Sequence, residues 1–252
     1  MNYQISRDIF KDKHVIFVVT HLCQPAIMLF MDSVIKVLDK HPDTVLAIID
    51  SRSNDEIIKY LKSLQHPQIV REFLDENIGK ARAANNFIAK YIDQNNLPKT
   101  VWSMDPDIIF DVPSFDYLLE AIQNVPDKIG VLGARYKKND CNPEINLWLP
   151  ARKVKGQNGK TYRLVTPIMC CVAGPILAMK GQTLKDPLDL KLFPKKFTRV
   201  YGGDDSATYL ELKRHGYKSA YLNGTQITHL RTAGGRKAEE LIAFAKENNL
   251  PL

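Results

Sequence analysis

The stretch Val101-Trp102-Ser103-Met104-Asp105-Pro106-Asp107 places two aspartates directly after a short apolar run. Short apolar runs bounded by turn residues are typical of buried strands. Because side chains alternate along an extended segment, Asp105 and Asp107 are expected to point to the same side. The stretch therefore predicts a strand that delivers two carboxylates to one place, where they can bind a divalent cation or its water ligands. A solvated acidic turn around Pro106 is the alternative interpretation.

Upstream of this stretch, apolar runs alternate with amphipathic patterns. Alternation of this kind is typical of β-α-β units and of a parallel sheet. In open α/β sheets, ligands bind beyond the carboxyl ends of the strands. Asp50, which ends the second predicted strand, is therefore expected to face the same crevice as Asp105. The predicted strands are Val15–Val19, Val45–Ile49, Ile69–Leu74 and Val101–Met104, and the predicted helices are Pro25–Leu38, one that begins near Asp55, and Gly79–Ile92.

The second half of the chain has a different texture. Residues 136–163 are polar, basic and loop-like, and we interpret them as an excursion from the domain because the apolar run MCCVAGPILAM follows them. Further elements are expected after that run: a helix over Asp204–His215 closed by Gly216, extended pieces at Tyr217–Leu222 and Ile227–His229, and an amphipathic helix over Arg236–Asn248 in the C-terminal segment 236–252.

Composition narrows the class of protein. Of 252 residues, 44% are hydrophobic and 25% charged, which is ordinary for a globular protein, and the net charge of +7 favours polyanionic partners. With no signal-peptide pattern and no long apolar run, we expect a cytoplasmic protein without a transmembrane segment. The four cysteines lack disulfide or zinc spacing and are expected to be buried free thiols: Cys23, Cys141, Cys170 and Cys171.

Five landmarks occur in order along the chain. They are Asp50 at a strand end, the spacing N-x-G-x-x-x-A-x-N over residues 77–85, SMDPD at 103–107, YGGDD at 201–205 and ITHL at 227–230. In this order they resemble the family 2 glycosyltransferases with the GT-A fold, over residues 14 to 231. The resemblance implies one α/β domain over residues 1–252, with a Rossmann-like, mixed but mostly parallel central sheet flanked by helices. Residues 14–110 would be its nucleotide-binding half and residues 111–235 its acceptor and catalytic half.

The resemblance also implies roles for individual residues. Asp205 would be the catalytic base, with Asp204 standing where the family usually has glutamate. The metal ligands would be Asp105, Asp107 and His229, and the residues that bind the donor would be Asp50, Asn77, Gly79, Asn85, Asp105, Gly174 and Arg231.

Several of these residues have structural explanations as well. Asn77 and Gly79 can be a helix cap and a turn glycine, and Asp204 and Asp205 can cap the helix that follows them. Gly174 can be a plain strand glycine, and a lone histidine is often an ordinary core or surface group. Pro106 inside the D-x-D stretch departs from the family pattern and puts the geometry of the metal site in question.

The implied reaction moves a sugar from a nucleotide diphosphate donor, usually a UDP-sugar, with Mn2+ or Mg2+ as cofactor. Inversion with Asp205 as the base is expected, and retention is the alternative. The acceptor is either a cell-surface or lipid-linked glycan, reached at an anionic membrane, or a modified, hydroxymethylated base in DNA, as in phage enzymes that act in the host cytoplasm.

Two other classes of protein remain for comparison. A non-catalytic module that binds nucleotide sugars or nucleic acid on the same fold would lack acidic residues that are present here. A Rossmann dehydrogenase is disfavoured because no G-x-G-x-x-G follows the first predicted strand.

Overall fold

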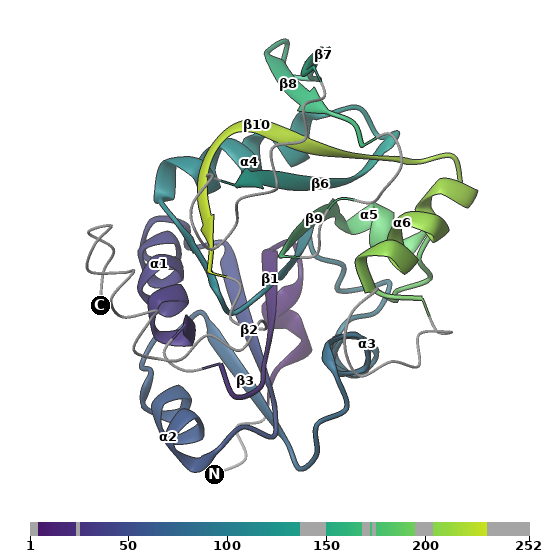
Figure 1. The fold of residues 1–252 in the computed structure, drawn as a ribbon. Coiled ribbons are helices and arrows are strands. Elements are labelled where there is room, and N and C mark those ends of the chain that lie inside the picture. Colours follow the sequence, from purple (N-terminus) through teal and green to yellow (C-terminus); the bar gives the residue numbers. More distant parts are fainter. Residues whose placement is uncertain are drawn as a thin grey trace.

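The computed structural model describes residues 5–23, 26–136, 150–167, 172, 175–194 and 204–230 (Figure 1). Its helices are a short 3-10 helix at Arg7–Phe10, α1 (Ala26–Lys40), α2 (Asp55–Ser63), α3 (Lys80–Tyr91), α4 (Val112–Asn124), α5 (Gly181–Lys185) and α6 (Asp204–Arg214). Its strands are β1 (His14–Thr20), β2 (Thr44–Ser51), β3 (Ile69–Leu74), β4 (Thr100–Met104), β5 (Ile108–Phe110), β6 (Ile129–Tyr136), β7 (Arg152–Lys155), β8 (Thr161–Val165), β9 (Ile176–Lys180) and β10 (Lys218–His229). No helix in these ranges has the length and apolar character needed to cross a membrane.

All ten strands belong to one sheet with the order β3-β2-β1-β4-β9-β6-β10-β8-β7, and β5 pairs with β10. The first four strands in this order are parallel, as the β-α-β pattern predicted. From β9 onward the pairing is mixed, because β9 runs antiparallel to β4 and β6 while β6 and β10 are parallel. The expected mixed sheet flanked by helices is confirmed, and it brings the carboxyl ends of β1, β2 and β4 to one edge.

Helices cover both faces of the sheet. One apolar cluster joins α1, α2 and α4 to alternate strand residues such as Ile16, Leu46 and Trp102. A second cluster joins α3, α5 and α6 to the intervening residues, such as Val15 and Phe17. Strands that are buried on both faces need apolar side chains at nearly every position, which explains why β1 and β2 were visible in the sequence as continuous apolar runs.

The basic excursion is more ordered than its composition suggested. Residues 152–165 form an antiparallel hairpin, β7–β8, that extends the sheet beyond β10. The loop-like interpretation was therefore wrong for this part, because Val154, Tyr162 and Leu164 alternate with the charged residues and pack inward. Residues 137–149 lie outside the described ranges.

Other boundaries differ in smaller ways. The two extended pieces expected at 217–222 and 227–229 are one strand, β10, whose pairing with β6 shifts register between Leu222 and Ile227. Helix α4, which we did not predict, starts at a local signal in which the Asp111 side chain accepts a hydrogen bond from the Ser114 backbone N–H at 2.8 Å. The helix expected at 236–248 lies outside the described residues.

A buried histidine sits at the amino ends of β1 and β4, opposite the edge that carries the aspartates. His14 is 2% exposed, with Nδ1 2.8 Å from the Thr100 hydroxyl and Nε2 3.3 Å from an Asp43 carboxylate oxygen. Burial lowers the pKa of His14 despite the opposing charge of Asp43. His14 is therefore expected to stay neutral in the folded protein at pH values where it is protonated in the unfolded chain.

This histidine makes stability depend on pH. The contribution of neutral His14 is present above about pH 6.5, the ordinary pKa of histidine, and is lost as the pH falls toward the lower folded-state pKa. We expect the free energy of unfolding to fall below pH 6.5 by up to about 1.4 kcal/mol per pH unit from this group. Chemical denaturation at pH 7.5 and 5.5 tests this, with His14→Gln expected to reduce the difference and His215→Gln, an exposed site, expected to preserve it. An unchanged pH dependence in His14→Gln would contradict the assignment.

Candidate active site

Two aspartates and a histidine meet where β4 ends. Asp105 follows β4 and Asp107 precedes β5, so Pro106 lies in the short turn between the two strands. β5 pairs antiparallel with β10, which sets His229 opposite Ile108. The backbone N–H of Leu230 donates to the carbonyl of Asp107 at 2.8 Å. This pairing places His229 next to the D-x-D turn of residues 105–107.

The three side chains have the arrangement of a cation site. Each offers one ligand atom, and these atoms lie within 4.8 Å of one another. Ligands on opposite sides of a small octahedral ion lie about 4.2 Å apart, so small side-chain adjustments would bring all three onto one ion. His229 Nε2 is 3.4 Å from Asp107 Oδ1, and Asp107 is 5% exposed. Carboxylate and imidazole ligands in this number suit a divalent cation such as Mn2+ or Mg2+.

A lysine that we did not single out in the sequence contacts this site. Lys80, the first residue of α3, places Nζ 2.6 Å from Asp105 Oδ1, and both side chains are about a quarter exposed, at 23% and 26%. Nζ also lies 5.8 Å from the centre of the Phe193 ring. Burial, joined by the charge of Asp107, raises the pKa of Asp105, and the Lys80 ammonium opposes this rise. The Lys80 ammonium thus favours the ionised form of the Asp105 carboxylate, against burial and the charge of Asp107.

Asp50 is the penultimate residue of β2, at the same edge of the sheet, but it is more deeply buried. It is 1% exposed, and its two carboxylate oxygens accept hydrogen bonds from the Thr20 hydroxyl at 2.8 Å and from the Ser53 backbone N–H at 2.9 Å. These bonds tie the end of β1 to the loop after β2. The structure therefore gives Asp50 a part in fixing the loop after β2, whereas its predicted contact with the nucleoside stays a prediction.

Cys23 lies in the loop after β1 and is the free, buried thiol that we expected at this position. Burial raises the pKa of its thiol to about 12, and the charges of Asp107 and Asp50 add to the rise. Cys23 is therefore protonated at neutral pH and is poorly suited to bind a cation or to act as a nucleophile. The other three cysteines lie outside the described residues.

Asn77 and Gly79 form the turn that leads into α3. The Asn77 side-chain oxygen accepts hydrogen bonds from the Gly79 backbone N–H at 3.0 Å and from the Ser51 hydroxyl at 3.2 Å. Ser51 in turn accepts from the Ile78 backbone N–H at 3.1 Å. Gly79 is the turn glycine that we set beside the donor role, whereas Asn77 is not the helix cap, because the N-cap position of α3 is Gly79 itself. The two residues connect the ends of β2 and β3 with the helix that carries Lys80.

Gly79 has a backbone conformation that only glycine adopts readily, with φ 81° and ψ 158°. Other residues in this region carry a strain of about 1 to 3 kcal/mol. We expect Gly79→Ala to lower the free energy of unfolding by that amount, measured by chemical denaturation. Asn86→Ala, an exposed change within the same helix, should stay within about 0.5 kcal/mol of the native protein. Equal stabilities for the two variants would contradict this account of the turn.

Asn85 forms two hydrogen bonds with Phe193, which precedes Asp204 and Asp205 in the chain. Its side-chain amide donates to the Phe193 carbonyl at 2.6 Å, and its side-chain oxygen accepts from the Phe193 backbone N–H at 3.1 Å. The Thr208 hydroxyl of α6 donates to the neighbouring Leu192 carbonyl at 3.0 Å. α3 and α6 are thereby held to one short segment, and the predicted donor contact of Asn85 stays a prediction.

α6 begins at Asp204, as the sequence predicted. The half-buried Asp205 accepts hydrogen bonds at Oδ1 from the backbone N–H of Ser206 at 2.7 Å and from its hydroxyl at 3.4 Å. This is a contact between neighbouring residues in the first turn of α6, where a carboxylate also interacts favourably with the helix dipole, and the catalytic role stays a prediction. Gly174, Arg231 and the side chain of Asp204 lie outside the described parts of the structure.

Comparison with known proteins gives different results for the sequence and for the structure. No model of a known protein family matches the chain, and no curated protein sequence matches it. Solved structures do match over most of its length. The mannosyltransferase PcManGT from Pyrobaculum calidifontis, in complex with GDP-Man and Mn2+, is 19% identical with a TM-score of 0.58, and the match covers 85% of this chain and 56% of that one. The chain has the GT-A fold.

Two further GT-A structures are similar. GalNAc-T7 with UDP, GalNAc and Mn2+ is 15% identical, with a TM-score of 0.60 over 86% of this chain and 43% of that one. Residues 1–349 of S. aureus TarS are 14% identical, with a TM-score of 0.55 over 92% of this chain and 64% of that one. The present chain therefore spans less than two thirds of the length of each of the three proteins. At these identities the likeness establishes the GT-A fold, which the sequence predicted.

Proposed function

We propose that this protein transfers a sugar from a nucleoside diphosphate donor to an acceptor hydroxyl. The observation that carries the proposal is the meeting of Asp105, Asp107 and His229 at the end of β4 on a GT-A sheet. Departure of a nucleoside diphosphate concentrates negative charge on its phosphate oxygens, and a site that holds a divalent cation beside a lysine is suited to that charge.

The proposed cofactor is Mn2+ or Mg2+, held by Asp105, Asp107 and His229. When bound, such an ion supplies Lewis acidity toward the diphosphate oxygens. The two carboxylates and the imidazole are the right kind and number of ligands, and Lys80 adds a positive charge beside Asp105. Asp50, Asn77 and Gly79 shape the donor pocket by joining the ends of β1, β2 and β3 to α3.

We assign the base to Asp205, near the start of α6. In the proposed step, Asp205 takes the proton of the acceptor hydroxyl. At the same time the acceptor oxygen forms a bond to the anomeric carbon. The bond from that carbon to the diphosphate oxygen breaks, and the nucleoside diphosphate leaves with the electron pair, which inverts the anomeric configuration. Support comes from the anchoring of α6 to the Leu192–Phe193 segment, which also contacts α3 at Asn85 and lies against Lys80.

UDP-sugars are the first donors to test. GalNAc-T7 was solved with UDP, and TarS was solved with UDP-GlcNAc, whereas PcManGT was solved with GDP-Man. The acceptor is a hydroxyl of a cell-surface or lipid-linked glycan, or of a hydroxymethylated base in DNA. We place the reaction in the cytoplasm.

A thermal-shift screen of nucleotide sugars with and without Mn2+ tests the proposal. A ligand that binds only the folded protein, at 100 times its dissociation constant, adds about 2.7 kcal/mol of stability. For a chain of this size that raises Tm by roughly 5 to 10 °C. We expect one class of nucleotide sugar to give such a shift, and to need the cation. A screen in which no nucleotide sugar shifts Tm, with or without Mn2+, would overturn the proposal. Binding without transfer to any hydroxyl would favour a non-catalytic module.

A further inference from the structure

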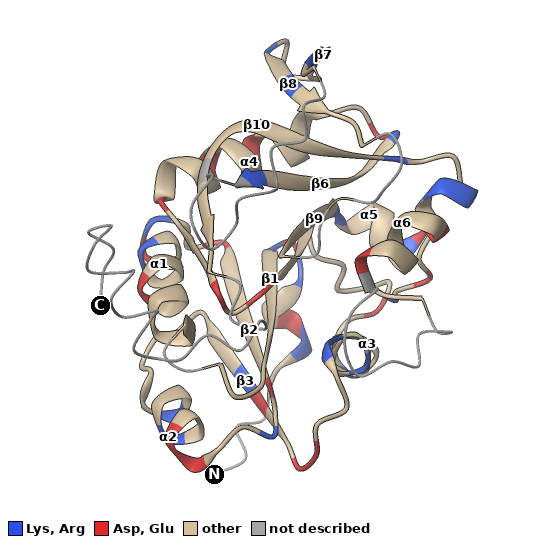
Figure 2. Cartoon of the chain, in the orientation of Figure 1, with Lys and Arg blue, Asp and Glu red and all other residues tan. Residues whose placement is uncertain are grey.

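The β7–β8 hairpin carries an unusual concentration of positive charge. Residues 152–165 include five Lys or Arg side chains and no Asp or Glu. Figure 2 shows blue segments in this hairpin, which lies beyond β10 at one extreme of the molecule. Lys160 forms an ion pair with Glu120 at 2.8 Å. Within the described part of the chain, the other four have no ion-pair partner: Arg152, Lys153, Lys155 and Arg163.

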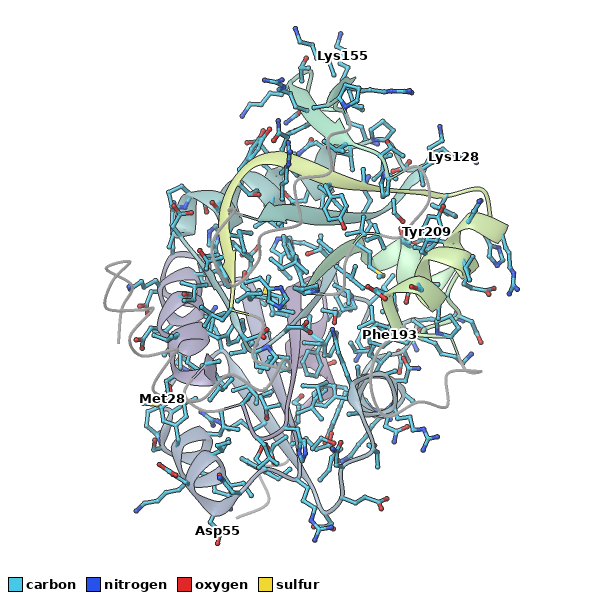
Figure 3. All side chains as sticks on the ribbon, in the orientation of Figure 1. Met28, Asp55, Lys128, Lys155, Phe193 and Tyr209 are labelled. Carbon is cyan, nitrogen blue, oxygen red and sulfur yellow. The ribbon has the colours of Figure 1, made fainter. Side chains whose placement is uncertain are left out.

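The packing of the hairpin fixes which side chains face outward. Tyr162 and Leu164 are buried, and the Tyr162 hydroxyl donates to Glu120 of α4 at 3.0 Å. The Gln157 backbone N–H in the turn donates to the Asn124 carbonyl at the end of α4 at 2.8 Å. Because side chains alternate along both strands, one face of the hairpin is held against α4 and the other is directed to solvent. Lys153, Lys155 and Arg163 are exposed on that outer face, and Figure 3 shows Lys155 at the outer end of the hairpin.

Like charges lie directly opposite each other on this outer face. The register pairs Lys153 with Arg163, and Lys155 follows two residues along the same strand. Directly opposed like charges destabilise an antiparallel pair. The chain therefore keeps an arrangement that is unfavourable alone and that a polyanion would make favourable.

We infer that the outer face of the β7–β8 hairpin is a binding surface for the phosphate backbone of double-stranded DNA. Successive cations on one strand are about 6.6 to 6.8 Å apart, with a third directly across, so they form a narrow row suited to a chain of regularly spaced charges. A two-stranded ribbon also has the width that the major groove of DNA admits. An anionic membrane is less well matched, because the described residues with large exposed apolar side chains, Leu22, Met28 and Leu210, all lie outside the hairpin. The inference concerns binding and is independent of the transfer reaction.

A pair of charge-matched triple variants tests the inference. The first variant removes the three positive charges of the outer face through Lys153→Gln, Lys155→Gln and Arg163→Gln. The control removes three exposed positive charges elsewhere through Lys11→Gln, Lys36→Gln and Lys59→Gln. Binding to a fluorescent 30-base-pair duplex is followed by anisotropy from 50 to 200 mM salt. Each lost phosphate contact should reduce the magnitude of the slope of log Kobs against log salt by about 0.9. The hairpin variant should therefore lose up to about 2.7 in slope, and its affinity at 50 mM salt should fall at least tenfold. The control should keep the slope of the native protein.

Three results would overturn the inference. They are no binding of the native protein at 50 mM salt, equal losses in both triple variants, and binding to vesicles of anionic lipid in place of duplex DNA. The single variant Lys155→Gln, which faces Thr161 across the hairpin, serves as a mild substitution that leaves the opposed pair untouched. Its slope should fall by about 0.9, and an unchanged slope would count against the surface even if the triple variant failed to fold.

Discussion

Asp107→Asn is expected to abolish Mn2+ binding and to reduce sugar transfer by at least about 1000-fold. Lewis-acid stabilisation of a leaving group is worth several kcal/mol, and about 4 kcal/mol corresponds to that factor. Asp107 is nearly buried beside His229, and it directly precedes β5, so its carboxylate is held in place at the site. Asparagine keeps the shape of the side chain and removes the charge on which an ion depends.

The measurements are Mn2+ binding by calorimetry and transfer by release of the nucleoside diphosphate. The control is Asp127→Asn, which removes one carboxylate charge at the amino end of β6, where Asp127 is 79% exposed and pairs with Lys180 at 2.7 Å. Native Mn2+ affinity in Asp107→Asn would show that the ion is held elsewhere.

Asp205→Asn is expected to lower kcat by about 100-fold to 10,000-fold while donor binding is retained. A positioned base contributes a factor of this size. Asparagine still offers Oδ1 to the Ser206 backbone N–H, so the start of α6 should be preserved. The thermal shift produced by donor and Mn2+ should match that of the native protein, because the change affects the acceptor proton and leaves the cation ligands in place.

A second acidic residue of the same helix provides the comparison. Glu211→Gln removes a carboxylate that pairs with Arg214 at 3.0 Å, and it should leave kcat within about twofold. A kcat for Asp205→Asn equal to that of Glu211→Gln would remove Asp205 from the reaction. The same assay on Asp204→Asn would then show whether the neighbouring acid is the base.

The sequence was most informative where local periodicity and burial agree. Strands β1 and β2 are buried at nearly every position and appear as continuous apolar runs, and the more exposed β3 has the predicted limits Ile69–Leu74. The order of the five sequence motifs predicted that Asp107 and His229 lie at one site, although they are far apart in the chain. They meet because β5 pairs with β10.

The sequence was least informative where a contact depends on tertiary packing. Nothing local indicates that the Lys80 ammonium reaches Asp105, or that Asp50 uses both carboxylate oxygens inside the protein. The hairpin was hidden for another reason, since charged residues dominate its composition and only alternate positions are apolar. That alternation, Val154 with Tyr162 and Leu164, was the signal from which it could have been found.

The pairing of β5 with β10 has a consequence for how the protein holds together. Asp107 directly precedes β5, and His229 ends β10, a strand that comes much later in the chain. A cation bound by both residues would connect two segments that are distant in the sequence. Because it would bind only the folded protein, it would also stabilise the fold. Chelation should then loosen the end of β10 before the parallel strands, which makes amide exchange at Thr228 and His229 a gauge of cofactor loading.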